Sequence, residues 1–144
     1  MERLEDRLAI EDLINRYAWA LDMRDFETLG TCFADECEFD SSPHELTPHL
    51  PFPARGREGI MSLVSGAQGK WASTQRRHVM TNLVVEFVDA RQAFAKAYMT
   101  VFHTDPPDAP RAVLAGHYED DVVFIENRWL FRKRTVYRDG PTAA

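Results

Sequence analysis

The feature that most constrains the fold is a change in the spacing of apolar residues about halfway along the 144-residue chain. In the first segment apolar side chains recur at helical spacing, which predicts one long amphipathic helix. The apolar face of this helix carries Ile10, Leu13, Ile14, Tyr17, Ala18 and Leu21. After Trp71 the pattern alternates from residue to residue, as it does in strands. Helices followed by a run of strands predict an α+β domain.

Short turn signals separate the strands, so successive strands are expected to pair antiparallel. The predicted strands span residues 75–88, 92–104, 111–126 and 128–138. A second helix is predicted to begin at Asp25, whose carboxylate suits an N-cap, and to end near Asp35. We therefore expect a single domain over 1–144, in which the sheet curls round the helices. Its expected parts are a helical hairpin at 1–35, a loop or flap at 41–57, a third helix at 56–70 and a curved sheet at 75–138.

Composition and charge narrow the classes of function. The chain has no apolar run long enough to span a membrane and begins with a charged segment, so we expect a cytoplasmic protein without an export signal. Its net charge of −6 argues against nucleic acid and membrane surfaces as partners. Cys32 and Cys37 are expected to be buried thiols, because they suit neither a disulfide nor a zinc site.

The stretch 128–138 interleaves arginines with aromatic residues, which could in principle follow a strand of RNA. The preferred interpretation is a half-buried strand, with Trp129, Phe131 and Tyr137 on one side and the arginines on the other. Nucleic acid is therefore not an expected partner.

Asp22 is the first candidate site residue. It lies at the C-terminal end of the predicted helix, where the partial negative charge of the helix end disfavours a carboxylate by up to about 1 kcal/mol. A partner that offsets this cost is one interpretation. The other is that Asp22 only opens the turn that leads to Asp25, which aspartate does well. The residues alone leave both open.

Two histidines lie on the predicted sheet. His78 begins the first strand and would share a face with Met80, Asn82 and Val84, although both faces of that strand are apolar. His103 ends the next strand on a face of small side chains that would leave room for a ligand. Taken singly, each histidine is more typical of a hydrogen-bonded core or strand-end residue.

Three stretches together resemble the SnoaL-like group of the nuclear-transport-factor-like superfamily, which is similar to scytalone dehydratase and lindane dehydrochlorinase. They are AIEDLINRYAWALDMRDFETLGTCFADECEF, RHVMTNLVVEF and GHYEDDVVFIENRWLFRKRTV. In those enzymes an aspartate ends the first long helix and a histidine opens the strand after the third helix, and Asp22 and His78 occupy these positions. His103 follows His78 at the spacing of a second histidine in scytalone dehydratase. The resemblance implies a cone-shaped, cystatin-like α+β barrel, with an antiparallel curved sheet and helices that enclose a pocket.

The resemblance also implies a chemistry. His78 would remove a proton beside a carbonyl, while Asp22 fixes its tautomer. His103 would position the leaving group or a water, and the hydroxyl of Tyr17 could polarise the substrate oxygen. We expect a cofactor-independent lyase (dehydratase-like) or isomerase acting on a hydrophobic cyclic oxygenated small molecule, with no metal. The expected substrate contacts are Leu21, Phe33, Met80, Asn82, Val84, Tyr98, Met99 and Val101.

The chain departs from scytalone dehydratase at the residues that polarise the carbonyl. Leu21 stands where that enzyme has a tyrosine, and no tyrosine occurs between Tyr17 and Tyr98. Scytalone itself is therefore not the expected substrate, and Tyr17, Asn82 or Tyr98 would be the donor. Of His117 and Tyr118, whichever faces inward would meet the ligand.

Two further expectations concern other classes of function. The same fold serves non-catalytic small-molecule-binding domains and the small subunit of ring-hydroxylating dioxygenases, and fold alone does not separate these from an enzyme. Sheets of this group commonly pair with another copy, which implies a homodimer or homotrimer. A metal site at His44, Glu45 and His49 is not expected, because ligands on a Pro-rich loop usually remain solvated.

Overall fold

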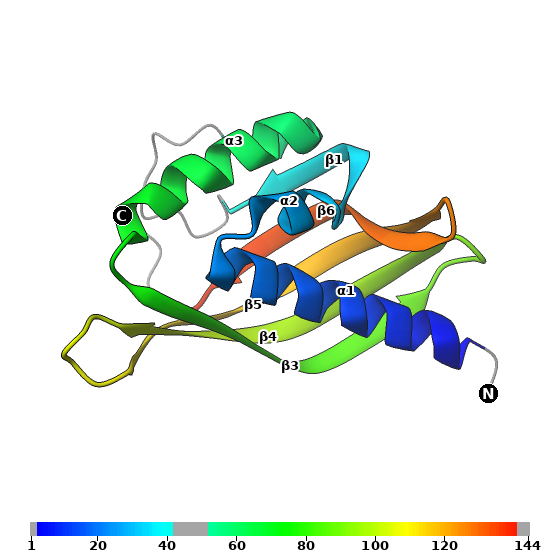
Figure 1. Ribbon diagram of the computed structural model, residues 1–144. Coiled ribbons are helices and arrows are strands. Elements are labelled where there is room, and N and C mark those ends of the chain that lie inside the picture. Colours follow the sequence, from blue (N-terminus) through cyan, green and yellow to red (C-terminus); the bar gives the residue numbers. More distant parts are fainter. Residues whose placement is uncertain (1–2, 42–51, 141–144) are drawn as a thin grey trace.

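The computed structural model describes residues 3–41 and 52–140 and is drawn in Figure 1. Its helices are α1 (Leu4–Met23), α2 (Phe26–Gly30) and α3 (Gly56–Gln68), the last followed by a 3₁₀ turn at Gly69–Trp71. Its strands are β1 (Phe33–Asp40), β2 (Ala54–Arg55), β3 (Gln75–Phe87), β4 (Gln92–Thr104), β5 (Arg111–Ile125) and β6 (Arg128–Arg138). No helix in the described ranges is long and apolar enough to cross a membrane.

The sheet has six strands in the order β2-β1-β6-β5-β4-β3, and α1 lies along it in Figure 1. The four strands expected from the sequence are confirmed to within one residue, and they pair antiparallel. The sheet is open, with β2 and β3 at its edges, so the expected barrel does not close.

Strand β1 and the two-residue strand β2, which pairs with it, are the strands that the sequence analysis missed. The second helix begins at Asp25, whose side chain accepts a hydrogen bond from the backbone N–H of Thr28, but it ends at Gly30 and not near Asp35. Buried Cys37 and Phe39 then alternate with more exposed neighbours, the pattern of a strand. Strand β1 pairs parallel with β6, so the sheet is not wholly antiparallel.

A β-bulge in β3 changes which side chains face the helices. The register shifts between Thr81 and Val84, and Asn82 adopts a positive φ of 58°. A bulge inserts one extra residue and so reverses the alternation beyond it. Met80 packs on the core before the bulge, and Val85 is buried after it. The expected common face of His78, Met80, Asn82 and Val84 is therefore wrong beyond Met80.

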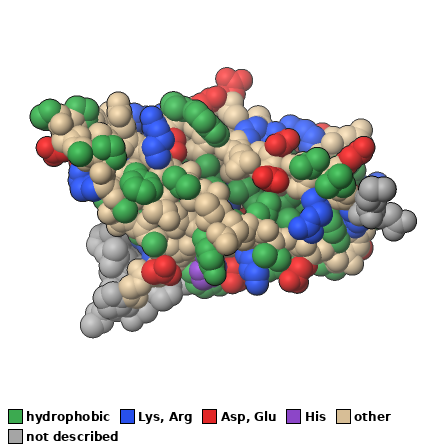
Figure 2. Space-filling view, turned by 90° about the horizontal axis from the view of Figure 1, so that it is seen from below, with side chains coloured by type: hydrophobic (Ala, Val, Ile, Leu, Met, Phe, Trp, Pro, Cys, Tyr) green, Lys and Arg blue, Asp and Glu red, His purple; other side chains and the backbone are tan. Residues whose placement is uncertain are grey.

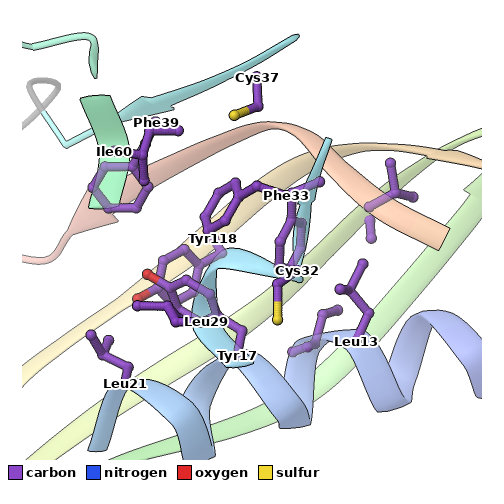
Figure 3. Close-up of a cluster of buried hydrophobic side chains, with 14 of the residues drawn as sticks. Leu13, Tyr17, Leu21, Leu29, Cys32, Phe33, Cys37, Phe39, Ile60 and Tyr118 are labelled. Carbon is purple, nitrogen blue, oxygen red and sulfur yellow. The ribbon is translucent and has the colours of Figure 1, made fainter. Parts of the chain in front are cut away.

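Aromatic rings join α1 to the sheet in the core (Figure 3). Tyr17 packs edge to face on Phe33, with ring centroids 6.0 Å apart, and on Phe131, with centroids 5.7 Å apart. Cys32 and Cys37 are free and buried, as expected. Burial raises the pKa of the Cys37 thiol to about 11, which makes it unreactive at neutral pH.

A buried ion pair lies beneath these rings. Arg134 Nε contacts Asp120 Oδ1 at 2.9 Å, and both side chains are 0% exposed. The guanidinium carbon also lies 4.1 Å from the ring centroid of Tyr17 and 3.8 Å from that of Tyr118. Burial raises the pKa of Asp120 to about 6, although the charge of Arg134 opposes the rise. This pair links β5 to β6 next to the rings of Tyr17 and Tyr118.

Candidate active site

The end of α1 and the start of β3 bring Asp22 and His78 together. His78 Nδ1 lies 2.6 Å from Asp22 Oδ1, and the backbone N–H of His78 donates to Asp22 Oδ2 at 2.7 Å. The two side chains are only 5% and 7% exposed. These two hydrogen bonds offset the cost of a carboxylate at a helix C-terminus, so Asp22 does more than open a turn.

The contact also determines how the imidazole can react. A carboxylate oxygen accepts a hydrogen bond, so the proton of a neutral His78 lies on Nδ1, toward Asp22. Nε2 is then the basic nitrogen. This is the arrangement of a histidine general base that is oriented by a carboxylate.

A cavity of about 190 Å³ lies beside His78, between α1, α3 and the inner face of the sheet. Most of its wall is apolar, with Leu21, Phe52, Leu63, Val64, Met99 and Leu114 among the contributors. A cavity with this lining suits a small apolar ring. Two hollows of about 580 and 680 Å³ elsewhere on the molecule are larger, but neither is lined by Asp22 or His78.

Two tyrosines bring hydroxyl groups to the cavity. Tyr17, expected from the sequence, and Tyr118 both line it, and Figure 3 shows their hydroxyl oxygens close together. Burial raises the pKa of both phenols, so both remain protonated donors. Tyr118 is the inward member of its pair, because His117 lies on the other face and stacks on Tyr137 with centroids 4.8 Å apart.

His103 is near the dyad but does not line the cavity. Its Nε2 accepts a hydrogen bond from Arg76 Nε at 3.2 Å, and its ring centroid lies 4.8 Å from that of Trp71. Burial and the charges of Arg76 and Arg111 lower the pKa of His103, which keeps the ring neutral and able to accept. The cavity residue beside it is Arg76.

Three expected substrate contacts border an open hollow on the outer face of the sheet. Asn82, Val84 and Tyr98 line the open hollow of about 580 Å³, and Tyr98 is 61% exposed. Val84 follows the bulge and faces outward, whereas Asn82 lies within the bulge and also borders a small hollow on the α1 side of the sheet. Tyr98 alternates with Met99, which lines the cavity, and so points away from it. None of the three lines the cavity beside His78, so the structure does not bring them to the dyad.

The other expected contacts lie on the inner side. Leu21 and Met99 line the cavity. Phe33 and Val101 are buried in the core, at 0% and 1% exposure. Met80 lines a separate hollow of about 120 Å³ that also involves residues of α1.

The arginines of β6 do not all face outward. The register of β6 against β5 skips Arg132, so the alternation changes phase there. Arg134 is fully buried, and Arg138 lines the cavity. The expectation that Tyr137 shares the inner face with Trp129 is wrong for the same reason. The inward placement of Arg134 and Arg138 follows from this bulge, and the sequence pattern gives no sign of the bulge.

Arg76 and Trp71 also line the cavity and were missed. A signal for Arg76 was present, because it precedes His78 by two residues and so shares its face in a strand. Across residues 3–41 and 52–140 no three His, Cys, Asp or Glu side chains are grouped to hold a metal ion. The discounted trio of His44, Glu45 and His49 lies outside the described residues.

Comparison with known proteins identifies the family. The model of the SnoaL-like domain matches residues 2–135. The chain belongs to the SnoaL-like domain family. No protein in the curated collection matches the chain significantly.

Solved structures support the fold of this SnoaL-like domain. A candidate scytalone dehydratase of Novosphingobium aromaticivorans is 24% identical, with a TM-score of 0.79 over 99% of this chain and 90% of that one. A candidate aromatic ring hydroxylase of the same bacterium is 27% identical, with a TM-score of 0.79 over 96% and 92%. An NTF2-like protein with a cystatin-like fold, also from that bacterium, is 22% identical, with a TM-score of 0.79 over 96% and 85%. The expected cystatin-like, nuclear-transport-factor-like fold is confirmed.

Proposed function

We propose that this SnoaL-like domain is a cofactor-independent lyase of the dehydratase type, or an isomerase, acting on a hydrophobic cyclic oxygenated small molecule. The observation that carries the proposal is the buried 2.6 Å contact between His78 Nδ1 and Asp22 Oδ1 beside an apolar cavity. A buried, oriented imidazole next to a ligand-sized space is typical of proton-transfer sites.

In the proposed reaction Nε2 of His78 takes a proton from the carbon beside a carbonyl group. The electron pair of the broken C–H bond enters the developing enolate, whose oxygen accepts a hydrogen bond from the hydroxyl of Tyr17 or of Tyr118. Collapse of the enolate breaks the C–O bond to a hydroxyl on the next carbon, and the imidazolium returns the proton so that water leaves. In an isomerisation the same proton would be returned to a different carbon. Asp22 stabilises the imidazolium throughout.

The test is to replace His78 with Gln and, separately, Asp22 with Asn, and to measure turnover on a panel of cyclic hydroxy-ketones by the absorbance of the enone formed. Each change should lower kcat/KM about a hundredfold or more, the usual contribution of a general base. His117→Gln is the matched control, because His117 lies on the outer face and should leave turnover unchanged. Circular dichroism checks that each variant is folded. If both dyad variants keep wild-type turnover, the proposal fails.

A second candidate function is binding without catalysis, either as a ligand-binding domain or as the small subunit of a ring-hydroxylating dioxygenase. The likeness to the candidate aromatic ring hydroxylase, at 27% identity, favours it. It would be supported by a large oxygenase subunit that co-purifies with the chain, together with substrate binding that persists in the absence of any turnover.

A further inference from the structure

We propose that the ligand of this cavity carries a carboxylate, and that Arg76, assisted by Arg138, binds it. This inference rests on the proposed function, because it names the class of substrate that the same site takes. The carboxylate would lie beside the dyad and would orient the reacting ring against His78.

The charge of the cavity wall is the first support. Arg76 and Arg138 line the cavity, and none of the lining residues in the described part of the chain is acidic. Nε of Arg138 is buried and has no hydrogen-bond partner among the described residues. The chain as a whole has a net charge of −6, so this positive wall is a local feature and not a consequence of composition. A buried donor without a partner is costly unless a ligand supplies the acceptor.

Arg76 is held in place without being neutralised. Its Nε donates to His103 Nε2, and its guanidinium carbon lies 5.6 Å from the ring centroid of Trp71. It makes no ion pair with a carboxylate of the described residues. Asp22 acts on it electrostatically, but both oxygens of that carboxylate already accept hydrogen bonds from His78. Burial lowers the pKa of Arg76, as expected for a cation that lacks full compensation.

The geometry of such a side chain suits a carboxylate. A guanidinium presents a planar fork of donors that matches the two oxygens of a carboxylate, and the pair is strongest where water is excluded. Here His103 accepts only from the Nε donor, which leaves the two terminal nitrogens of the guanidinium for a ligand. His103 is therefore a positioning residue for Arg76. Because Arg76 and His78 are two residues apart on one strand face, their Cα atoms are separated by about 7 Å. That distance places the carboxylate on a substituent of the ring, not at the reacting carbon.

The experiment compares benzoate with benzamide, which has the same shape but no charge, by isothermal titration calorimetry. The wild-type protein should bind benzoate about tenfold more tightly than benzamide, the difference expected of a charge-assisted hydrogen bond. Arg76→Met should abolish that preference, whereas Arg76→Lys should retain part of it. Arg77→Met is the matched control, because Arg77 is the exposed neighbour on the same strand and its loss should change neither affinity. Arg138→Met gives a second test of the wall should Arg76→Met not fold.

Equal affinity for the two probes, no binding of either, or an effect of Arg77→Met as large as that of Arg76→Met would each overturn the inference. The measurement is repeated in His78→Gln, which needs no turnover. If His78→Gln still prefers benzoate, the carboxylate site is intact. If the same variant also still turns over hydroxy-ketones, the catalytic proposal fails while the carboxylate site stands.

Discussion

Arg76 and His103 show that the neighbours of a reactive group can matter as much as the group itself. His103 was expected to contact the leaving group, yet its Nε2 is occupied by Arg76. That hydrogen bond requires an unprotonated nitrogen, and the lowered pKa of His103 is consistent with it. The state of this one ring therefore determines how firmly Arg76 is held against the cavity.

This coupling predicts a pH dependence of stability. The pKa of His103 is lower in the folded protein than the ordinary value of 6.5, so the unfolded chain binds a proton more readily. The contribution of His103 is fully present above pH 6.5 and is lost as the pH falls through the folded-state pKa. The free energy of unfolding, measured with urea at pH 7 and pH 5, should therefore fall less in His103→Gln than in the wild type. Equal falls in the two proteins would contradict the assignment.

At the scale of elements, β5 and β6 are joined by a charge pair that no water reaches. Arg134 and Asp120 are fully buried beneath the tyrosines that line the cavity. A buried pair contributes little net stability, but removal of one partner leaves an uncompensated charge in the interior. Removing one charge of the pair should therefore destabilise the protein even when the new side chain has the same volume.

Asp120→Asn should lower the free energy of unfolding by about 3–5 kcal/mol, because Arg134 would lose its counter-charge. Urea denaturation measures the change. Asp121→Asn, at the next position of the same strand, is the matched control and should stay within about 0.5 kcal/mol of the wild type. If the two variants have the same free energy of unfolding, the Arg134–Asp120 pair does not make the expected contribution to stability.

The elements themselves could be predicted well where one pattern ran for long enough. The four long strands have eleven to fifteen residues of alternating character and clear turns, and the sequence placed them within a residue. Strand β1 was missed because its alternation covers only the short stretch Cys37–Asp40 and follows a helix without a turn signal. The bulges at Asn82 and Arg132 leave no trace in a binary pattern, so the facing of residues beyond them could not be predicted.

The candidate site was predictable in a different way. Spacing alone never linked Asp22 to His78, since they are 56 positions apart. The resemblance to a family of known arrangement linked them, and the 2.6 Å contact agrees with it. Arg76 could have been found by strand alternation from His78, whereas Tyr118 and Arg138 required knowledge of the register of β5 and β6.

At the scale of the whole molecule, the helices cover one face of the sheet and leave the other to solvent. Val79, Val84, Tyr98 and Val113 on strands β3 to β5 are each at least 40% exposed. Figure 2, which views the molecule from below, shows hydrophobic side chains at the surface among acidic and basic ones. An uncovered sheet face with large apolar side chains is typical of an interface.

We therefore expect a homodimer or homotrimer that associates through the outer face of the sheet. Light scattering coupled to size-exclusion chromatography should give a mass of two or three chains. Tyr98→Glu should shift the protein toward the monomer, because it places a charge at the most exposed aromatic residue of that face. Trp19→Glu, an equally drastic change on the exposed side of α1, is the control. A monomeric wild type would contradict the expectation.

The two hydrogen bonds between Asp22 and His78 have a consequence beyond orientation of the ring. One of them comes from the main chain of β3, so the carboxylate fastens the tail of α1 to the edge strand of the sheet. Edge strands and helix ends are the parts of a domain that open first in thermal fluctuations. The same two hydrogen bonds therefore orient the imidazole and hold the end of α1 on β3. A local opening that releases the end of α1 would remove the carboxylate from His78 while the rest of the domain is still folded.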